Sequence, residues 1–311
     1  MLITGAAGHV GRALLSNPAI GSYAVTACDI NPIADASDKT FSFQTLDVRE
    51  TEMVDAVFAT CKPQVVIHLA SVVTPPQGTG RQFAYDVDVE GTQNIIDACL
   101  KHEVGRLIVT SSGAAYGYHP DNDVPLSESS PIRGNYEFPY SHHKRLVEEK
   151  LAEARDSNPE LEQVVLRVGT VLGNGLENQI TALFRKPRLL GLTGNESPFV
   201  FIWDTDLTNI ILMAVDESEP GIFNVAGDGS LGVSALARIL GKPVLRFPAW
   251  FLKAALAIAF PLGLSRYGPE QVRFLQFRPI LDNLRLKQEF GYVPKKTSLE
   301  AFEAWRKQAG L

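Results

Sequence analysis

Cysteine is scarce in this chain, with only Cys28, Cys61 and Cys99 among 311 residues. They are odd in number and widely spaced, and no two form a Cys-x-x-Cys pair. This pattern argues against a disulfide framework and against a cysteine-based zinc site, and it favours a reducing, cytoplasmic location. No metal site is expected.

Blocks of positive charge and long hydrophobic runs are also missing. The net charge is -6 and no segment is rich in Lys and Arg, so neither nucleic acid nor an anionic membrane surface is expected as the main partner. The most apolar late run, 249–264, contains Lys253 and Pro261 and is shorter than the roughly 20 residues of a membrane span. We interpret it as a buried or pocket-lining helix, with docking on a membrane surface as the alternative. The start, Met1 to Thr4 followed by glycines, is unlike a signal peptide.

The first half of the chain alternates short β-rich runs with longer helical patterns, which is typical of βαβ units. Strands are predicted over residues 1–4, 23–28, 41–46, 65–69, 107–111 and 163–168. Helices are predicted over residues 9–16, 51–60, 83–102 and 140–155. The predicted fold class is α/β: a doubly wound parallel Rossmann sheet with a smaller, mostly helical C-terminal substrate lobe.

The domain boundaries are placed where this alternation loosens. Residues 1–168 are predicted to form the nucleotide-binding domain, and residues 199–226, with two strand-like runs, to return to it. Residues 169–198 and 227–311 are predicted to form the substrate lobe. The ligand cleft is expected between the two parts.

A glycine cluster follows the first predicted strand and opens the first predicted helix. Gly5, Gly8 and Gly11 let backbone approach a pyrophosphate at a positively polarised helix N-terminus. Asp29 stands at the end of the second strand, where a carboxylate can bind the adenosine ribose hydroxyls and would repel a 2′-phosphate. The predicted cofactor is therefore NAD rather than NADP.

Tyr140 and Lys144 are four residues apart, so a helix places both side chains on one face. A tyrosine pKa near 10 must fall by roughly 3 units, or about 4 kcal/mol, before the side chain can act as a base near neutral pH. An ammonium at ~4 Å supplies a Coulomb energy of about 4 kcal/mol at an effective dielectric of ~20. Downstream of a dinucleotide site, this pair predicts redox chemistry.

These motifs, in this order and spacing, resemble the extended short-chain dehydrogenase/reductases, the NAD-dependent epimerase/dehydratase family. The resemblance covers most of the chain and rests on residues 4–11, 47–48, 68–71, 109–117, 140–144, 166–173 and 201–207. It implies cofactor contacts from Gly5, Gly8, His9, Val10, Gly11, Asp29, Asp47, Val48, Leu69, Ala70, Ser71, Tyr140 and Lys144. It also implies a catalytic set in which Ser112 binds the reacting oxygen, Tyr140 transfers its proton and Lys144 binds the nicotinamide ribose.

Three departures from the family bear on substrate and mechanism. Ser112-Gly-Ala114 stands where sugar-nucleotide 4,6-dehydratases carry Thr-Asp-Glu, which argues against dehydration. Phe199 replaces the arginine that typically holds a nucleotide diphosphate, which counts against a sugar nucleotide. Other cations lie nearby in sequence at Arg185, Lys186 and Arg188. Asp88 replaces the usual asparagine and cannot donate an amide proton, which puts the usual proton relay in doubt.

Three histidines and a group of aromatics have structural interpretations. His142 and His143 are adjacent on a helix, point about 100° apart, and are expected at the surface rather than around a metal. His68, on a buried strand, is expected to pack near the cofactor. The lobe aromatics are interpreted as core, with an apolar substrate pocket as the alternative. They are Phe247, Trp250, Phe251, Phe260 and Phe274.

The leading hypothesis is an NAD-dependent oxidoreductase that transfers hydride at a secondary alcohol or ketone, and its small-molecule substrate can be apolar. The alternatives are a sugar-nucleotide epimerase with tightly bound NAD, and an NAD-binding sensor or scaffold without turnover. Homodimers that form through the helix bearing Tyr140 are common in the family, so a homodimer is one expected assembly.

Overall fold

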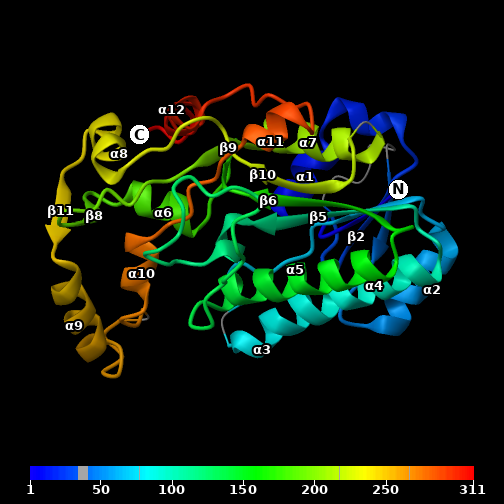
Figure 1. Ribbon diagram of the computed structural model, residues 1–311, viewed down its shortest axis with the longest axis horizontal. Helices are drawn as coiled ribbons and strands as arrows, with labels where there is room; N and C mark the ends of the chain where they lie inside the picture. Colours follow the sequence, from blue (N-terminus) through cyan, green and yellow to red (C-terminus); the bar gives the residue numbers. More distant parts are fainter. Residues whose placement is uncertain (34–40, 77, 217, 266) are drawn as a thin grey trace.

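The computed structural model describes residues 1–33, 41–76, 78–216, 218–265 and 267–311, and its centre is a parallel sheet (Figure 1). The seven strands lie in the order β10-β6-β5-β4-β1-β2-β3. They are β1 (Leu2–Thr4), β2 (Thr26–Asp29), β3 (Ser42–Thr45), β4 (Val65–His68), β5 (Arg106–Ser112), β6 (Glu162–Val168) and β10 (Gly221–Val225). The direction of winding reverses between β1 and β4, which places a ligand crevice at the carboxyl ends of these two strands.

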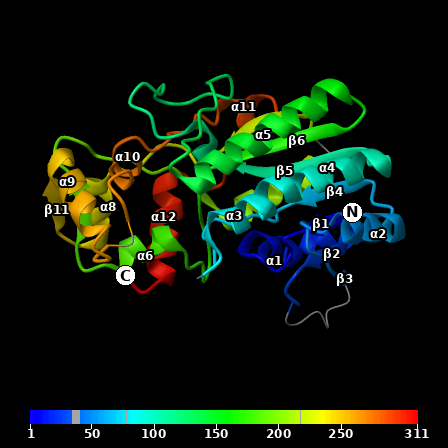
Figure 2. The same ribbon diagram turned by 90° about the horizontal axis from the view of Figure 1, so that it is seen from below.

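Helices cover both faces of this sheet (Figures 1 and 2). One face carries α1 (His9–Leu15) and α7 (Asp204–Asp216), and the other carries α2 (Thr51–Cys61), α4 (Gly91–Lys101) and α5 (Pro139–Ser157). Successive strand residues point to opposite layers: Ile3 belongs to the α1/α7 core and Leu2 to the α2/α4/α5 core. Both cores are apolar, as strands covered on two faces require. The predicted doubly wound α/β fold is confirmed.

The helix predicted over residues 83–102 is interrupted. α3 (Gly80–Tyr85) runs into a π-helical turn at Asp86–Glu90, which continues into α4. A Cβ on Gly91 would lie 2.6 Å from Val48 Cγ2, so glycine lets the helix approach the segment after β3. Single π-helical turns, such as the one at Asp86–Glu90, are frequent at functional sites.

The lobe is built from short elements around an aromatic core. β7 (Thr170–Leu172) pairs with β9 (Phe201–Trp203), and β8 (Leu189–Leu192) pairs with β11 (Val244–Phe247). The helices are α6 (Gln179–Arg185), α8 (Val233–Leu240), α9 (Ala249–Ala259), α10 (Gln271–Gln276), α11 (Leu284–Gln288) and α12 (Ser298–Gln308). Phe184, Phe201 and Phe302 pack edge-on or stacked at the centre of this core. Of the segment 199–226, β10 lies at the edge of the main sheet, whereas β9 belongs to the small sheet with β7.

Residues 249–264 differ from the buried or pocket-lining helix that we expected. α9 has no buried residue, and Trp250, Phe251 and Phe260 are exposed rather than part of a core. The prediction was wrong because an apolar helix that packs along a single narrow stripe has the same composition as a buried one. Among the described residues, no helix combines the length and the apolar character needed to cross a bilayer.

Candidate active site

The glycine cluster forms a tight turn between β1 and α1. Gly5 has a φ of +69°, and a Cβ there would lie 2.5 Å from the Ala70 backbone nitrogen. A Cβ on Gly11 would lie 2.5 Å from the carbonyl oxygens of Gly5 and Ala6. Only glycine fits at these two positions. Gly8 precedes α1 without a side-chain cap, and His9 and Val10 form its first turn, so the helix start fits an anion.

One carboxylate, Asp29, is the last residue of β2, and another, Asp47, lies two residues after β3. Asp29 accepts hydrogen bonds from the backbone N–H groups of Ala7 (3.0 Å) and Asn31 (2.9 Å), which hold it beside the glycine turn. Its oxygens keep free lone pairs for hydroxyl donors. Asp47 pairs with Arg49 at 2.5 Å, and this hydrogen bonding lowers the pKa of the Asp47 carboxyl. Val48, next to it, is buried against Gly91.

The end of β4 closes the other side of the glycine turn. The Leu69 N–H donates to the Thr4 carbonyl oxygen at 3.1 Å, and Ala70 follows directly above Gly5. In the described part of the chain, the shielded Ser71 hydroxyl has no hydrogen-bond partner, as expected for a group that meets a ligand. The glycine turn, the Asp29 carboxylate and the unpaired Ser71 hydroxyl together form a site that fits a dinucleotide.

His68 is packed rather than free, as predicted. Its ring lies between the hydroxyls of Thr4 (2.7 Å from Nδ1) and Thr92 (3.1 Å from Nε2). Burial, and next the nearby charge of Lys144, lowers the pKa of His68 to about 3. The imidazole is therefore neutral near pH 7 and spaces β4 from α4.

α5 carries Tyr140 and Lys144 on one face, as their spacing predicts. The Lys144 ammonium lies 5.7 Å from the centroid of the Tyr140 ring and donates to the Thr110 carbonyl oxygen at 3.0 Å. Lys144 is only 4% exposed, whereas the Tyr140 side chain is partly open to solvent. Pro139 begins the helix one residue earlier, where its missing N–H costs no hydrogen bond. A shielded cation thus stands beside a reachable phenol.

Ser112 lies at the end of β5, next to the start of α5. Its hydroxyl accepts the Ala114 N–H at 3.1 Å and opens a short 3-10 turn. The Ser141 hydroxyl donates to the Ala114 carbonyl oxygen at 2.6 Å, which ties this turn to the first turn of α5. The structure therefore brings the segments of Ser112, Tyr140 and Lys144 together, and their catalytic roles stay predictions.

His143 is not at the surface, contrary to our prediction. It is fully buried, with Nδ1 3.4 Å from the Asp88 carboxylate and its ring edge-on to Tyr85 at 5.7 Å between centroids. The other Asp88 oxygen accepts the Val72 N–H at 2.7 Å. The prediction failed because α5 is covered both by the sheet and by α3 with its π-helical turn, so a second face of the helix is enclosed. The neighbouring His142 is partly exposed.

A cation that the sequence did not single out lies against Phe199. The Arg278 guanidinium carbon is 3.7 Å from the Phe199 ring centroid and 4.6 Å from that of Phe274. It donates to the Ser197 carbonyl oxygen and hydroxyl, both at 2.6 Å, while its shielded Nε has no partner among the described residues. Burial lowers the pKa of Arg278 to about 9. Near pH 7 the group is charged, and no carboxylate of the described residues forms an ion pair with it.

Arg278 bears on the inference drawn from Phe199. The position of Phe199 does have a cation beside it, supplied from far along the chain, whereas Arg185, Lys186 and Arg188 are exposed. Tyr118 interacts electrostatically both with Arg278 and with Tyr140, the predicted catalytic tyrosine. Burial and then Tyr140 raise the pKa of Tyr118, while Arg278 opposes them, and Phe274 packs edge-on against Tyr118 at 5.3 Å. No sequence signal distinguishes such an arginine from a surface one.

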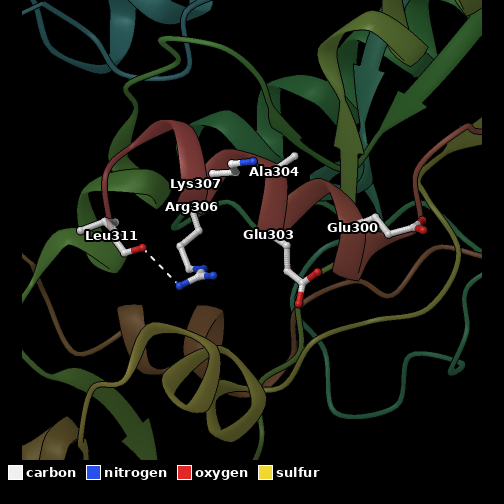
Figure 3. A pocket seen from close by; sticks show the side chains of 6 residues that line it. All are labelled: Glu300, Glu303, Ala304, Arg306, Lys307 and Leu311. Atoms are coloured by element: carbon white, nitrogen blue, oxygen red, sulfur yellow. Dashed lines mark hydrogen bonds between the residues drawn. The ribbon is translucent and has the colours of Figure 1, made fainter.

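A surface hollow lies beside α12 (Figure 3). It is lined by Glu300, Glu303, Ala304, Arg306, Lys307 and Leu311. The Arg306 guanidinium donates to the Leu311 carbonyl oxygen at 3.3 Å across it. None of the predicted site residues lines this hollow, so it is not a candidate active site.

Known proteins resemble the chain in sequence and in fold. The model of the NAD dependent epimerase/dehydratase family matches residues 1–226. "Uncharacterized protein Rv0501" of Mycobacterium tuberculosis is 25% identical over 322 aligned positions, which cover 100% of this chain and 84% of that protein. The decarboxylating sterol-4-alpha-carboxylate 3-dehydrogenase of Schizosaccharomyces pombe is 35% identical over 135 residues, 43% of this chain and 38% of its own length. UDP-glucose 4-epimerase of Thermus thermophilus, solved in complex with NAD, superimposes with a TM-score of 0.74 at 22% identity and covers 99% of this chain and 97% of that chain.

Proposed function

Because the chain belongs to the NAD-dependent epimerase/dehydratase family, we propose that it is an NAD-dependent dehydrogenase of secondary alcohols whose substrate is an apolar molecule with an anionic group. The observation that carries the redox part is the shielded Lys144 ammonium beside Tyr140, at the carboxyl end of β5. Such a pair fits proton transfer at a substrate hydroxyl far better than it fits a sensor or scaffold without turnover.

NAD is the cofactor of this family, and the residues present fit it. The glycine turn would hold the pyrophosphate, Asp29 the adenosine ribose, and Ser71 a group nearer the nicotinamide. When bound there, the oxidised cofactor would supply an acceptor for the hydride of the carbinol carbon, and the reduced cofactor would supply a hydride donor for the ketone.

The chain itself handles the proton and the oxygen. Ser112 donates a hydrogen bond to the substrate oxygen, and Tyr140 accepts the hydroxyl proton during oxidation or returns it during reduction. Lys144 places its positive charge beside the Tyr140 ring, 5.7 Å from the ring centroid. Since Lys144 is shielded from water, this charge is screened little by salt.

Arg278 supports the anionic group on the substrate. A guanidinium without a carboxylate partner gains charge-assisted hydrogen bonds when a carboxylate or phosphate arrives. Phe199 and Phe274 flank it. Phe199 is buried and stacked on Phe201, so Phe274, which is half-buried, is the ring that would contact an apolar body. The name of the fission-yeast relative describes such a substrate, a sterol that carries a carboxylate.

Sugar-nucleotide epimerisation is the second candidate, and Arg278 favours it too. A diphosphate would satisfy the same guanidinium. The two candidates differ in their products: an epimerase regenerates its NAD within each cycle, whereas a dehydrogenase releases NADH.

The test compares wild type with Tyr140→Phe on carboxylated sterols, hydroxy acids and UDP-sugars, and it follows the nicotinamide absorbance band and the products. We expect net NADH from an apolar, anionic alcohol, and a loss of roughly 10²–10⁴-fold in Tyr140→Phe. Tyr136→Phe, at an exposed tyrosine just before the helix, is the matched control and keeps full activity. Interconversion of UDP-sugars without NADH would select the epimerase, and an unchanged rate in Tyr140→Phe would refute both.

A further inference from the structure

One end of the lobe exposes large apolar side chains. Residues 249–264, comprising α9 and the loop after it, are called the apolar end below. Trp250 is 72% exposed, Ile258 64%, Leu262 65% and Leu264 79%. A cluster of this kind on a water-soluble surface marks an interaction site.

The packing of α9 leaves most of its circumference open. Leu252, Leu256 and Ala259 recur at helical spacing and are half-buried, on the side where α9 lies next to α10. Every other α9 residue after Ala249 is exposed, and the exposed residues are apolar except Lys253. The helix is therefore apolar on the faces that no described part of the chain covers.

Charge is distributed unevenly along this stretch of the chain. Residues 229–269 contain five of the 29 Lys and Arg of the chain and none of its 35 Asp and Glu. Arg238 and Lys253 are exposed, whereas Arg246 is paired with Glu196 from another segment. In a chain with a net charge of -6, this one segment is purely cationic.

The apolar end is also far from the sheet. α9 lies at the extremity of the lobe in both views, away from α4 and α5 (Figures 1 and 2). It is thus separate from the helix through which homodimers of this family commonly form.

We propose that the apolar end docks on the surface of an anionic lipid bilayer. The exposed apolar residues would enter the boundary between headgroups and acyl chains, with the aromatic ring of Trp250 at headgroup depth. Lys253 would extend its ammonium to the lipid phosphates. A second copy of the chain fits this surface less well, because a two-fold contact would bring the same cations together from both copies.

Vesicle flotation with the full-length, NAD-bound protein tests the proposal. The probes are vesicles of phosphatidylcholine alone, and of phosphatidylcholine mixed with phosphatidylglycerol, at low and high salt. We expect binding to the mixed vesicles that weakens at high salt, and little binding to phosphatidylcholine alone. Failure to bind the mixed vesicles, or equal binding to both kinds, overturns the proposal.

Variants locate the surface. Lys253→Glu changes the local charge by two and is expected to weaken binding on the order of 20-fold, since each charge near an anionic surface contributes about fivefold. The triple variant Trp250→Ser, Ile258→Ser, Leu264→Ser is expected to lose binding altogether. Val293→Ser, at a residue 64% exposed outside the apolar end, is the matched control and binds like wild type.

Three further measurements keep the outcome decisive. All three positions are exposed, so we expect the triple variant to fold. Unchanged circular dichroism and unchanged NAD binding would establish this. Light scattering tests the second-copy alternative: a dimer that the triple variant dissociates would refute the lipid assignment. The lipid result does not depend on catalysis, so it stands or falls separately from the dehydrogenase proposal.

Discussion

Two arginines show how the sheet domain and the lobe differ. Arg167, on β6, is 2% exposed and forms a bidentate pair with Glu148 at 2.7–3.0 Å, with a further bond to the Tyr116 hydroxyl. Burial alone would lower its pKa, but Glu148 raises the pKa above the ordinary value. Arg278, in the lobe, stacks on Phe199 with no carboxylate of the described residues beside it, and its pKa falls to about 9.

The difference between the two arginines suggests that Arg167 contributes to stability and Arg278 to ligand recognition. In the sheet domain the buried charges of Arg167 and Glu148 are paired with each other, and this network beneath β5 and β6 stabilises the scaffold. Among the described residues of the lobe, Arg278 has hydrogen bonds to Ser197 but no carboxylate partner, and α9 has no buried residue. These are the two groups for which we propose a ligand and a lipid surface. Four changes test whether this division is real.

The largest effect is expected for Glu148→Ala, which leaves Arg167 buried without its carboxylate. Loss of one partner of a buried pair costs about 3–5 kcal/mol of unfolding free energy. Chemical denaturation measures this. Glu149→Ala, at the next residue, removes only a half-exposed pair with Arg145 and should change stability by less than about 0.5 kcal/mol. Equal effects of the two changes would contradict the proposed network.

Arg278→Met should act on binding more than on stability. We expect the affinity for the proposed anionic substrate to fall by about 2–3 kcal/mol, roughly 30–150-fold, because hydrogen bonds to a charged group are lost. Titration calorimetry with the substrate found in the activity screen measures this loss. The matched control is Arg273→Met, which removes an exposed partner of Glu137 on the same stretch of chain and keeps the affinity. A drop in stability as large as that of Glu148→Ala would erase the contrast between the two arginines.

His68 gives the sheet domain a specific response to acid. Its folded pKa of about 3 is far below the ordinary 6.5, so the unfolded chain binds this proton first as the pH falls. Stability should therefore decrease between about pH 6.5 and pH 3, by roughly 2 kcal/mol at pH 5 from this group alone. In His68→Asn the dependence should flatten over this window, which acid titration of the denaturation midpoint would detect. An identical slope in both proteins would mean that the ring is not held neutral.

The smallest effect is expected for the folding of Trp250→Ser. The side chain is 72% exposed, so the unfolding free energy should change by less than about 0.5 kcal/mol. Trp305→Ala, in the aromatic core of the lobe and 2% exposed, should cost about 3–5 kcal/mol by comparison. Thermal unfolding of the two variants separates them. A large loss in Trp250→Ser would mean that α9 is part of the core after all.

The sequence predicts best where function depends on neighbours along the chain. The turn at Gly5 to Gly11, the strand end at Asp29 and the helical pair Tyr140 and Lys144 are local patterns, and the structure places each of them in the predicted local element. The fold class follows from the same alternation of short elements.

Prediction fails where an environment is assembled from distant segments. His143 is buried by a π-helical turn whose extra residue no periodicity revealed, and Asp88 meets it from 55 positions away. Phe199 gains its cation from Arg278, and composition alone could not tell whether α9 is covered. In each case the sequence identifies the residue but does not reveal which distant segment lies against it.

The position of β10 has a consequence for synthesis of the protein. β10 pairs with β6 along Gly221–Val225, yet the chain must first make β7, α6, β8, β9 and α7. At 5–20 residues per second, the roughly 50 intervening residues take about 3–10 s to translate. During that interval the edge of β6 presents unpaired backbone groups on the ribosome, and a nascent chain in that state can pair with another. Slow translation after Val168 should therefore lower the yield of folded protein, while a pause after Val225 should not.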